Sequence, residues 1–154
     1  EISISGIATG TVITQAACAD GDCTNELFGL KQIAENVWQS AEGLVYSSKR
    51  IGHVFSHLTN NTVKPNHGVF NDSPQEALKL IDQAWTLVKN FDSKVVAFEN
   101  PGFRSGTAFI IDMDKVIGYV GGSIGASLGF PETTFLQLVV DGVNVISAYP
   151  VLYP

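Results

Sequence analysis

The residues best suited to proton transfer are concentrated in one short segment, residues 51–70, which contains all three histidines of the chain. These are His53, His57 and His67. Imidazole has an unperturbed pKa near neutrality, so two imidazoles can serve as general base and general acid in one turnover without a metal. Residues 64–66 separate His67 from the other two and would let two imidazoles approach a substrate from opposite sides. Acid–base catalysis is therefore the first interpretation, and a histidine cluster on a solvated loop is the alternative.

A metal site is the second chemical interpretation of this segment. His53 and His57 are four residues apart, so on a helix they face the same side, and His67 or Asp72 would supply a third ligand. The glutamate of the H-E-x-x-H motif is missing, since Val54 occupies its position. The acid–base interpretation is preferred, and a metal-dependent hydrolase that uses His53 and His57 stays open as an alternative.

Two hydroxyl-bearing side chains near the C-terminus form a further candidate site. Ser147 and Tyr149 are two residues apart, so on a β-strand both project from the same face. A hydroxyl and a phenol side by side can hold a base or a phosphate group. The alternative is the polar outer face of an edge strand.

Residues 121–125 match the G-x-S-x-G nucleophile elbow, with Ser123 at the centre. In that motif the serine lies between a strand and a helix, and an acidic residue and then a histidine follow it in the chain. No histidine follows residue 67, so a serine hydrolase is disfavoured. Residues 121–129 are expected to form a flexible connection between strands instead.

The net charge of −6 is unevenly distributed along the chain. Residues 1–43 carry six acidic side chains and one basic one, which gives −5, and residues 44–154 carry nine acidic and eight basic ones, which gives −1. A net acidic chain is a poor candidate for nonspecific nucleic-acid binding, because such binding depends on Lys and Arg neutralising phosphates. The nearly neutral part can still form a local basic site, lined by Lys49, Arg50, Lys64, Lys94 and Arg104.

The two cysteines, Cys18 and Cys23, flank a turn-prone Ala-Asp-Gly-Asp segment. A disulfide between them is sterically feasible and would imply an oxidising stage in the life of the protein. Two free thiols on a mobile tail are the alternative. A structural zinc site is not expected, since no second cysteine pair completes a set of four ligands.

The length of 154 residues fits one domain plus an extension, and 45% hydrophobic residues are enough for an ordinary core. No apolar run approaches the ~20 residues of a membrane span, so no stable membrane insertion is expected. The chain begins at Glu1 rather than Met, which suggests a fragment or a processed piece of a longer protein.

The N-terminal third is expected to precede the main domain. Residues 1–23 show neither a helical nor an alternating period, which predicts a linker. From Thr24 apolar residues recur at helical spacing, which predicts an amphipathic helix that ends at Gly43. Its apolar positions are Leu27, Leu30, Ala34, Val37, Trp38 and Ala41. The predicted division is an entry or linker segment over 1–43 and a folded domain over 44–154.

A second helix and a series of strands follow. Residues 73–76 form a capping box with proline at the first helical position, which predicts a helix ending near Asn90. Later segments are rich in β-branched and aromatic residues and are separated by turn residues, which predicts strands over Lys94–Phe98, Thr107–Met113, Val116–Val120, Phe135–Val140 and Val143–Tyr149. Asp141-Gly142 predicts a hairpin between the last two. The expected class is α+β, with N-terminal helices packed on an antiparallel, twisted sheet.

These elements and motifs together resemble a known family. The chain has G-H-V-F-S-H at residues 52–57, a third histidine downstream, a predicted antiparallel sheet, and S-A-Y-P at residues 147–150. This combination resembles the C-terminal toxin domains of bacterial contact-dependent growth inhibition and related polymorphic toxin systems. More narrowly, it is similar to those with the barnase/EndoU/colicin/RelE ribonuclease fold. The resemblance covers about residues 44–154.

The EndoU branch of that fold has two histidines some fifteen residues apart, then a basic residue, then Ser/Thr-x-Tyr near the end. Here His53 and His67 are 14 residues apart, and Ser147 and Tyr149 fit the last element. The resemblance makes Lys94 or Arg104 the basic residue. His57 is a further candidate for the catalytic histidine. Gly68 alone follows His67, where that branch has Gly-rich surroundings.

The resemblance implies a metal-independent endoribonuclease that cleaves structured RNA, with tRNA as the expected substrate. The ribose 2′-OH would attack the adjacent phosphate and leave a 2′,3′-cyclic phosphate, with one imidazole as base and another as acid. Arg104 or Lys94 would stabilise the developing charge, and Ser147 and Tyr149 would position the phosphate or stack a base. Lys49, Lys64 and Lys94 are the candidate RNA-binding residues. No cofactor is needed, because RNA carries its own nucleophile.

The resemblance also implies a setting and a partner. The domain would be secreted as part of a larger cell-surface protein and delivered to the cytoplasm of a target bacterium, with residues 1–43 helping entry. A cognate immunity protein would bind it in the cell that makes it. The alternative from a different class is a non-enzymatic binding or immunity-type protein, for which the acidic net charge would mimic nucleic acid.

Overall fold

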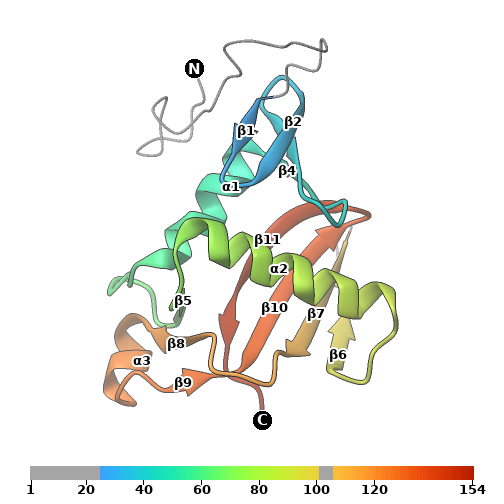
Figure 1. Cartoon of the computed structure of the whole chain (residues 1–154). Helices are drawn as coiled ribbons and strands as arrows, with labels where there is room; N and C mark the ends of the chain where they lie inside the picture. The colour runs from blue at the N-terminus through green and yellow to red at the C-terminus, as the bar shows by residue number, and fades with distance from the viewer. Residues whose placement is uncertain (1–24, 101–105) are drawn as a thin grey trace.

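An eight-stranded β-sheet is the main element of the computed structural model, which describes residues 25–100 and 106–154. The strand order is β1-β2-β3-β4-β11-β10-β7-β6 (Figure 1). All neighbouring strands are antiparallel except β4 and β11, which are parallel. The strands are β1 Glu26–Leu27, β2 Leu30–Ala34, β3 Val37–Gln39, β4 Val45–Ser47, β6 Val95–Glu99, β7 Thr107–Asp112, β10 Phe135–Asp141 and β11 Asn144–Val151.

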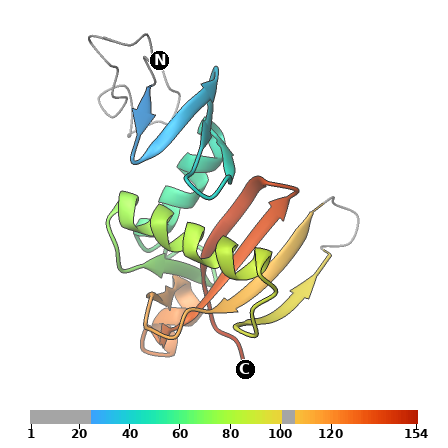
Figure 2. The ribbon, with the colours of Figure 1, turned by 45° about the vertical axis from the view of Figure 1, so that its right-hand side comes forward.

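A smaller sheet carries the end of the histidine segment. Its strand order is β5-β8-β9, with β5 at His67–Phe70, β8 at Gly118–Gly121 and β9 at Glu132–Thr133. The helices are α1 Ser48–Phe55, the 3-10 turn η2 Ser56–Leu58, α2 Pro74–Lys89 and α3 Gly122–Ser127. Figures 1 and 2 show α2 lying across the large sheet, where it contacts β10 and β7.

The capping box correctly predicted α2. The Ser73 side chain accepts a hydrogen bond from the backbone N–H of Glu76, and Pro74 opens the helix. The apolar stripe faces the sheet, and its buried members are Ala77, Leu78, Leu80, Ile81 and Ala84. Because these side chains belong to the same core cluster as Leu136 and Leu138 of β10, α2 closes the core over one face of the large sheet.

The five strands predicted after residue 90 all exist, with ends that differ from the prediction by up to a few residues. The predicted hairpin joins β10 to β11, with Asp141 paired to Asn144 and Gly142 in the left-handed region at φ +62°. The chain therefore has mixed α+β structure with a large, mostly antiparallel sheet and few helices, as the class prediction expected.

The predicted helix over residues 24–43 is wrong. This stretch forms β1, β2 and β3 instead, and it turns at Phe28-Gly29 and again at Asn36, all three with positive φ. Positive φ is incompatible with a right-handed helix, and glycine and asparagine are the residues that adopt it most readily. Leu27, Leu30 and Trp38 are nonetheless buried, so the helical spacing of apolar residues reflected a shared core and not a helix face.

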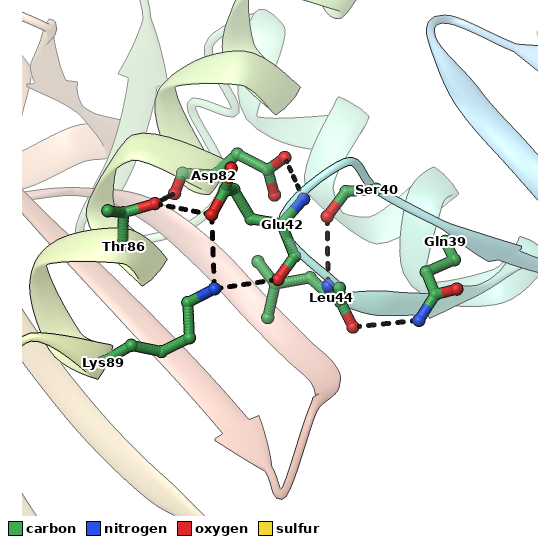
Figure 3. Close-up of polar contacts among 8 residues, drawn as sticks. Gln39, Ser40, Glu42, Leu44, Asp82, Thr86 and Lys89 are labelled. Carbon is green, nitrogen blue, oxygen red and sulfur yellow. Dashed lines mark hydrogen bonds and ion pairs between the residues drawn. The ribbon is translucent and has the colours of Figure 1, made fainter.

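The loop between β3 and β4 is fastened to α2 by polar contacts around Glu42 (Figure 3). The Glu42 backbone N–H donates to Asp82 Oδ2 at 3.1 Å, and its carboxylate accepts from Thr86 Oγ1 at 3.1 Å and from Lys89 Nζ at 3.2 Å. Lys89 and then Thr86 hold the pKa of Glu42 below its usual range. Residues 25–43 therefore pack against α2, and Leu27, Leu30 and Trp38 belong to the same core cluster as its buried side chains.

Residues 1–24 and 101–105 lie outside the described ranges. The cysteine pair of Cys18 and Cys23 and the candidate basic residue Arg104 fall within them. No helix of the described ranges is both long and apolar enough to cross a membrane.

Candidate active site

The candidate site lies along the edge of β11 that faces α1 and β5. On this edge β4 pairs with β11 at one position only, Val45 with Asn144. Beyond that pair α1, and then β5 of the smaller sheet, lie against β11 in place of a strand paired with it. The α1 helix begins where the Ser47 side chain accepts a hydrogen bond from the backbone N–H of Arg50. Because β4 pairs with so little of β11, this edge of β11 is open to other elements. It brings α1, which carries basic residues, alongside the strand that carries Ser147 and Tyr149.

Four aromatic rings from four elements meet at this edge. His57 of η2 stacks between His67 of β5 and Tyr149 of β11, with centroid distances of 4.3 Å and 4.8 Å and interplanar angles of 17° and 25°. His53 of α1 meets His57 edge to face at 5.4 Å. The structure therefore brings together all three histidines and Tyr149, which lies 82 residues after His67.

Two of the three histidines are inaccessible to a substrate. His57 is 5% exposed and His67 is 3% exposed. His57 Nδ1 donates to the Gly68 carbonyl at 2.8 Å, and His67 Nε2 donates to the carbonyls of Ser56 and Thr59 at 3.0 and 3.1 Å, because a carbonyl can only accept. The expectation of two imidazoles approaching a substrate from opposite sides is wrong for His57 and His67, which are packed face to face.

His53 is the histidine that a substrate can reach, since its side chain is half-buried. Burial lowers the pKa of His53 below its ordinary value, and the positive charges of Lys64, Arg50 and His67 lower it further. The His53 imidazole is therefore neutral near pH 7 and can accept a proton. Lys64 and Arg50 are thus cationic side chains close enough to influence His53.

Arg50 lies one turn before His53 on the same face of α1. Its Nη1 donates to the Ile146 carbonyl at 3.4 Å. Ile146 is the extra residue of a β-bulge in β11, because Val139 pairs with Ser147 and Val140 pairs with Val145. The bulge turns a backbone acceptor toward the helix and holds the guanidinium beside the site.

Ser147 and Tyr149 project from the same face of β11, since exposure alternates along this part of the strand. The Tyr149 hydroxyl accepts a hydrogen bond from Gln137 Nε2 at 2.9 Å, and burial raises the pKa of the phenol. Arg50 contacts Ile146 and His57 contacts Tyr149, so α1 and β11 run side by side. His53 comes between Arg50 and His57 in the chain, on the helix that lies against β11.

The candidate basic residues fall in different places. Lys49 is exposed on α1. Lys64 is close enough for its charge to lower the pKa of both His53 and His57. Lys94 lies beyond β10 and β7, before β6, and forms an ion pair with Asp114 at 3.4 Å. The predicted contribution of Lys94 is therefore not supported by its position, and Arg50 is the arginine that the described residues place at the site.

The glycine-rich segment after β8 has a structural role. It is not the flexible connection that the sequence suggested, because residues 122–127 form α3. The first N–H groups of α3 donate to the loop that precedes β5. Ser123 N donates to Lys64 O and Ile124 N to Pro65 O, both at 2.8 Å. Gly122 N donates to Asn60 Oδ1 at 2.8 Å. The motif therefore fixes the loop that carries Lys64 toward His53.

The arrangement does not supply the ligand set of the metal interpretation. No three His, Cys, Asp or Glu side chains in the described ranges are placed to hold one metal ion. His57 and His67 have nearly parallel rings, so their nitrogen lone pairs do not converge on one point. Asp72 is exposed beyond the end of β5.

Comparison of the chain with protein-family models, with curated proteins and with solved structures finds no match.

The buried imidazole of His57 makes the fold sensitive to acid. Burial lowers the pKa of His57 from its ordinary value of 6.5 to about 4, so the unfolded chain binds a proton there between these pH values and the folded chain does not. One unit of pKa corresponds to ~1.4 kcal/mol, so this group alone removes up to about 3 kcal/mol of stability as the pH falls from 6.5 to 4. We expect this loss in urea unfolding measured across that range.

The His57→Asn variant is the matched test of the acid sensitivity, since its amide can donate to the Gly68 carbonyl and does not titrate. The variant should lose much of the pH dependence below 6.5, while the contributions of His53 and the carboxylates remain. An unchanged pH dependence in the variant would assign the effect to other groups.

Proposed function

We propose that this chain is a metal-independent endoribonuclease acting on structured RNA. The observation that carries the proposal is the setting of His53: an accessible imidazole with a lowered pKa, one helical turn after Arg50 and close to Lys64, on the helix that lies against the strand of Ser147. A base next to two cations is what transesterification of RNA requires, because the reaction deprotonates a ribose hydroxyl and adds charge to a phosphate. The chain is acidic overall, so this cationic site is a local feature.

In the proposed reaction His53 removes the proton of the ribose 2′-OH, which attacks the neighbouring phosphorus. The bond to the 5′ oxygen of the next nucleotide breaks, leaving a 2′,3′-cyclic phosphate and a 5′-hydroxyl. Arg50 and Lys64 stabilise the charge on the phosphoryl oxygens, and the Ser147 hydroxyl helps to hold the phosphate. The Tyr149 hydroxyl accepts from Gln137 and keeps its own proton, which it donates to the leaving oxygen.

His57 and His67 are positioning residues in this proposal. His57 touches His53 and Tyr149, and His67 supports His57 from the other side. Both are held by backbone carbonyls, so they fix the rings that take part in the reaction. In this proposal His53 and Tyr149 take the roles of base and acid that the resemblance gave to two of the three histidines.

The proposal extends to the biological class. The residues that resemble the contact-dependent growth inhibition toxins are His53 and the Ser147-Ala148-Tyr149 triplet, and they belong to α1 and β11, two elements that lie against each other. A large, mostly antiparallel sheet with few helices is compatible with the barnase/EndoU/colicin/RelE-like fold proposed for it. We therefore propose a toxin domain of a larger secreted protein, delivered to the cytoplasm of a target bacterium and bound by a cognate immunity protein in its producer.

Incubation of the purified protein with total RNA and with DNA, both in the presence of a chelator, tests the reaction. We expect fragments of RNA that end in 2′,3′-cyclic phosphates and intact DNA, because DNA lacks the 2′-OH. Cleavage of DNA, or activity lost in chelator, would favour the metal-dependent hydrolase. Absence of cleavage, together with harmless expression in a bacterial host, would favour the non-enzymatic binding or immunity-type protein.

A further inference from the structure

A pocket of about 490 Å³ opens where β4 leaves β11, at the end of the site next to Arg50. We call it the β4–β11 notch. Val45 and Ser47 of β4, Arg50 of α1 and the β10–β11 hairpin line it, the hairpin through Asp141, Asn144, Val145 and Ile146. The notch exists because the two strands pair only through Val45 and Asn144 before α1 separates them. Its volume lies within the range of small-molecule sites.

The walls of the notch combine apolar surface with groups that can recognise a base. Val45 and Ile146, which are both half-buried, supply apolar surface for a flat ring. The Asn144 side chain carries both a donor and an acceptor, and its Nδ2 donates to the Asp141 carbonyl at 3.2 Å, which fixes the amide at the mouth of the hairpin. A side-chain amide is one of the groups that distinguish nucleobases by hydrogen bonding.

The position of Arg50 connects the notch to the reacting groups. Arg50 lines the notch and lies one helical turn from His53. A phosphate held between Arg50 and His53 therefore has one nucleoside on the notch side. The nucleoside that carries the attacking 2′-OH must lie next to His53, which removes the proton. The notch is the pocket that shares Arg50 with the surroundings of His53.

We propose that the β4–β11 notch binds the nucleobase on the 5′ side of the cleaved bond, with Asn144 as a specificity-determining residue. This inference rests on the proposed ribonuclease function and adds the subsite and its nucleotide. A second pocket of about 290 Å³, lined in part by Gly68, Tyr149 and Leu152, lies at the other end of the same edge and is the competing location.

Binding of the four nucleoside 3′-monophosphates to the ¹⁵N-labelled protein tests the subsite without requiring cleavage. We expect saturable shifts of the backbone signals of Val45, Arg50, Val145 and Ile146, with one base preferred, and smaller shifts with inorganic phosphate alone. Shifts confined to the pocket of Tyr149 and Leu152, or absence of binding, would overturn the inference. This result is independent of whether RNA is cleaved.

Mapping of cleavage sites in Asn144→Ala tests specificity. We expect the preference for the nucleotide at the new 3′ end to weaken about tenfold or more relative to the wild type. Asn100→Ala is the matched control, because Asn100 also holds one side-chain hydrogen bond, from Thr107 at 3.2 Å, and lies at the opposite edge of the sheet. An unchanged preference in Asn144→Ala would overturn the inference while leaving the proposed function intact.

The Ser47→Asp variant keeps the inference testable if the Asn144 variant does not fold. Aspartate retains the cap of α1 and adds a carboxylate to the notch beside Arg50. Binding of the preferred 3′-monophosphate should weaken about tenfold or more, with thermal unfolding unchanged. Undiminished binding would place the nucleotide elsewhere.

If the wild type binds nucleotides in the notch and cleaves no RNA, the proposed function fails and the subsite stands.

Discussion

Replacement of His53 by alanine is expected to lower the rate of RNA cleavage by ~10²–10⁴-fold, the usual effect of removing a general base. The stability should change little, because His53 is only half-buried and meets the ring of His57 edge to face, outside the parallel stack. The measurement is the initial rate of cleavage of a defined RNA in chelator, together with thermal unfolding of both proteins.

The pH dependence and a matched histidine variant separate catalysis from folding. Because the pKa of His53 is lowered, the wild-type kcat/KM should fall only below pH 6.5, where the imidazole becomes protonated. His67→Ala should reduce activity together with stability, since His67 is buried and joins β5 to the end of η2. Full activity in His53→Ala would assign the base to another group and contradict the proposed mechanism.

The elements that the sequence predicted best are those with characteristic capping or turn residues at their ends. The capping box at Ser73 and the hairpin at Asp141-Gly142 each contain their own start or turn residues, and both exist as expected. The prediction of a helix over residues 24–43 is wrong because the spacing of its apolar residues matched a helix. The turns that separate its strands depend on positive φ at Phe28 and Asn36. Neither residue type signals such a turn strongly by itself.

The site could be predicted only in part, for a related reason. The short spacing of His53, His57 and His67 indicated a cluster, the spacing of Ser147 and Tyr149 indicated a second candidate site, and the resemblance to toxin domains joined the two. Nothing in the spacing predicted that two of the imidazoles would be buried against each other. The role of Arg50 depends on a bulge at Ile146, 96 residues later, which no local pattern of the sequence marks.

The close approach of β5 to β11 is a second determinant that the sequence did not reveal, and it depends on Gly68. A Cβ at this position would overlap the carbonyl oxygen of Pro150 and lie 2.8 Å from the carbonyl carbon. Both atoms belong to backbone, so no side-chain rotation can relieve the contact. The Gly68 carbonyl is also the acceptor for His57 Nδ1, and a displaced β5 would draw it away from the ring stack.

We therefore expect Gly68→Ala to lower the free energy of unfolding by about 3 kcal/mol or more, the upper range for overpacking, and to lower RNA cleavage as well. Gly129→Ala is the matched control: a Cβ there meets nothing within 4 Å, and its φ of +83° costs about 1–2 kcal/mol. Urea unfolding of the two variants beside the wild type measures the difference. If Gly68→Ala were no less stable than Gly129→Ala, β5 could move away from β11 without cost, and the stack of His67, His57 and Tyr149 would not depend on their contact.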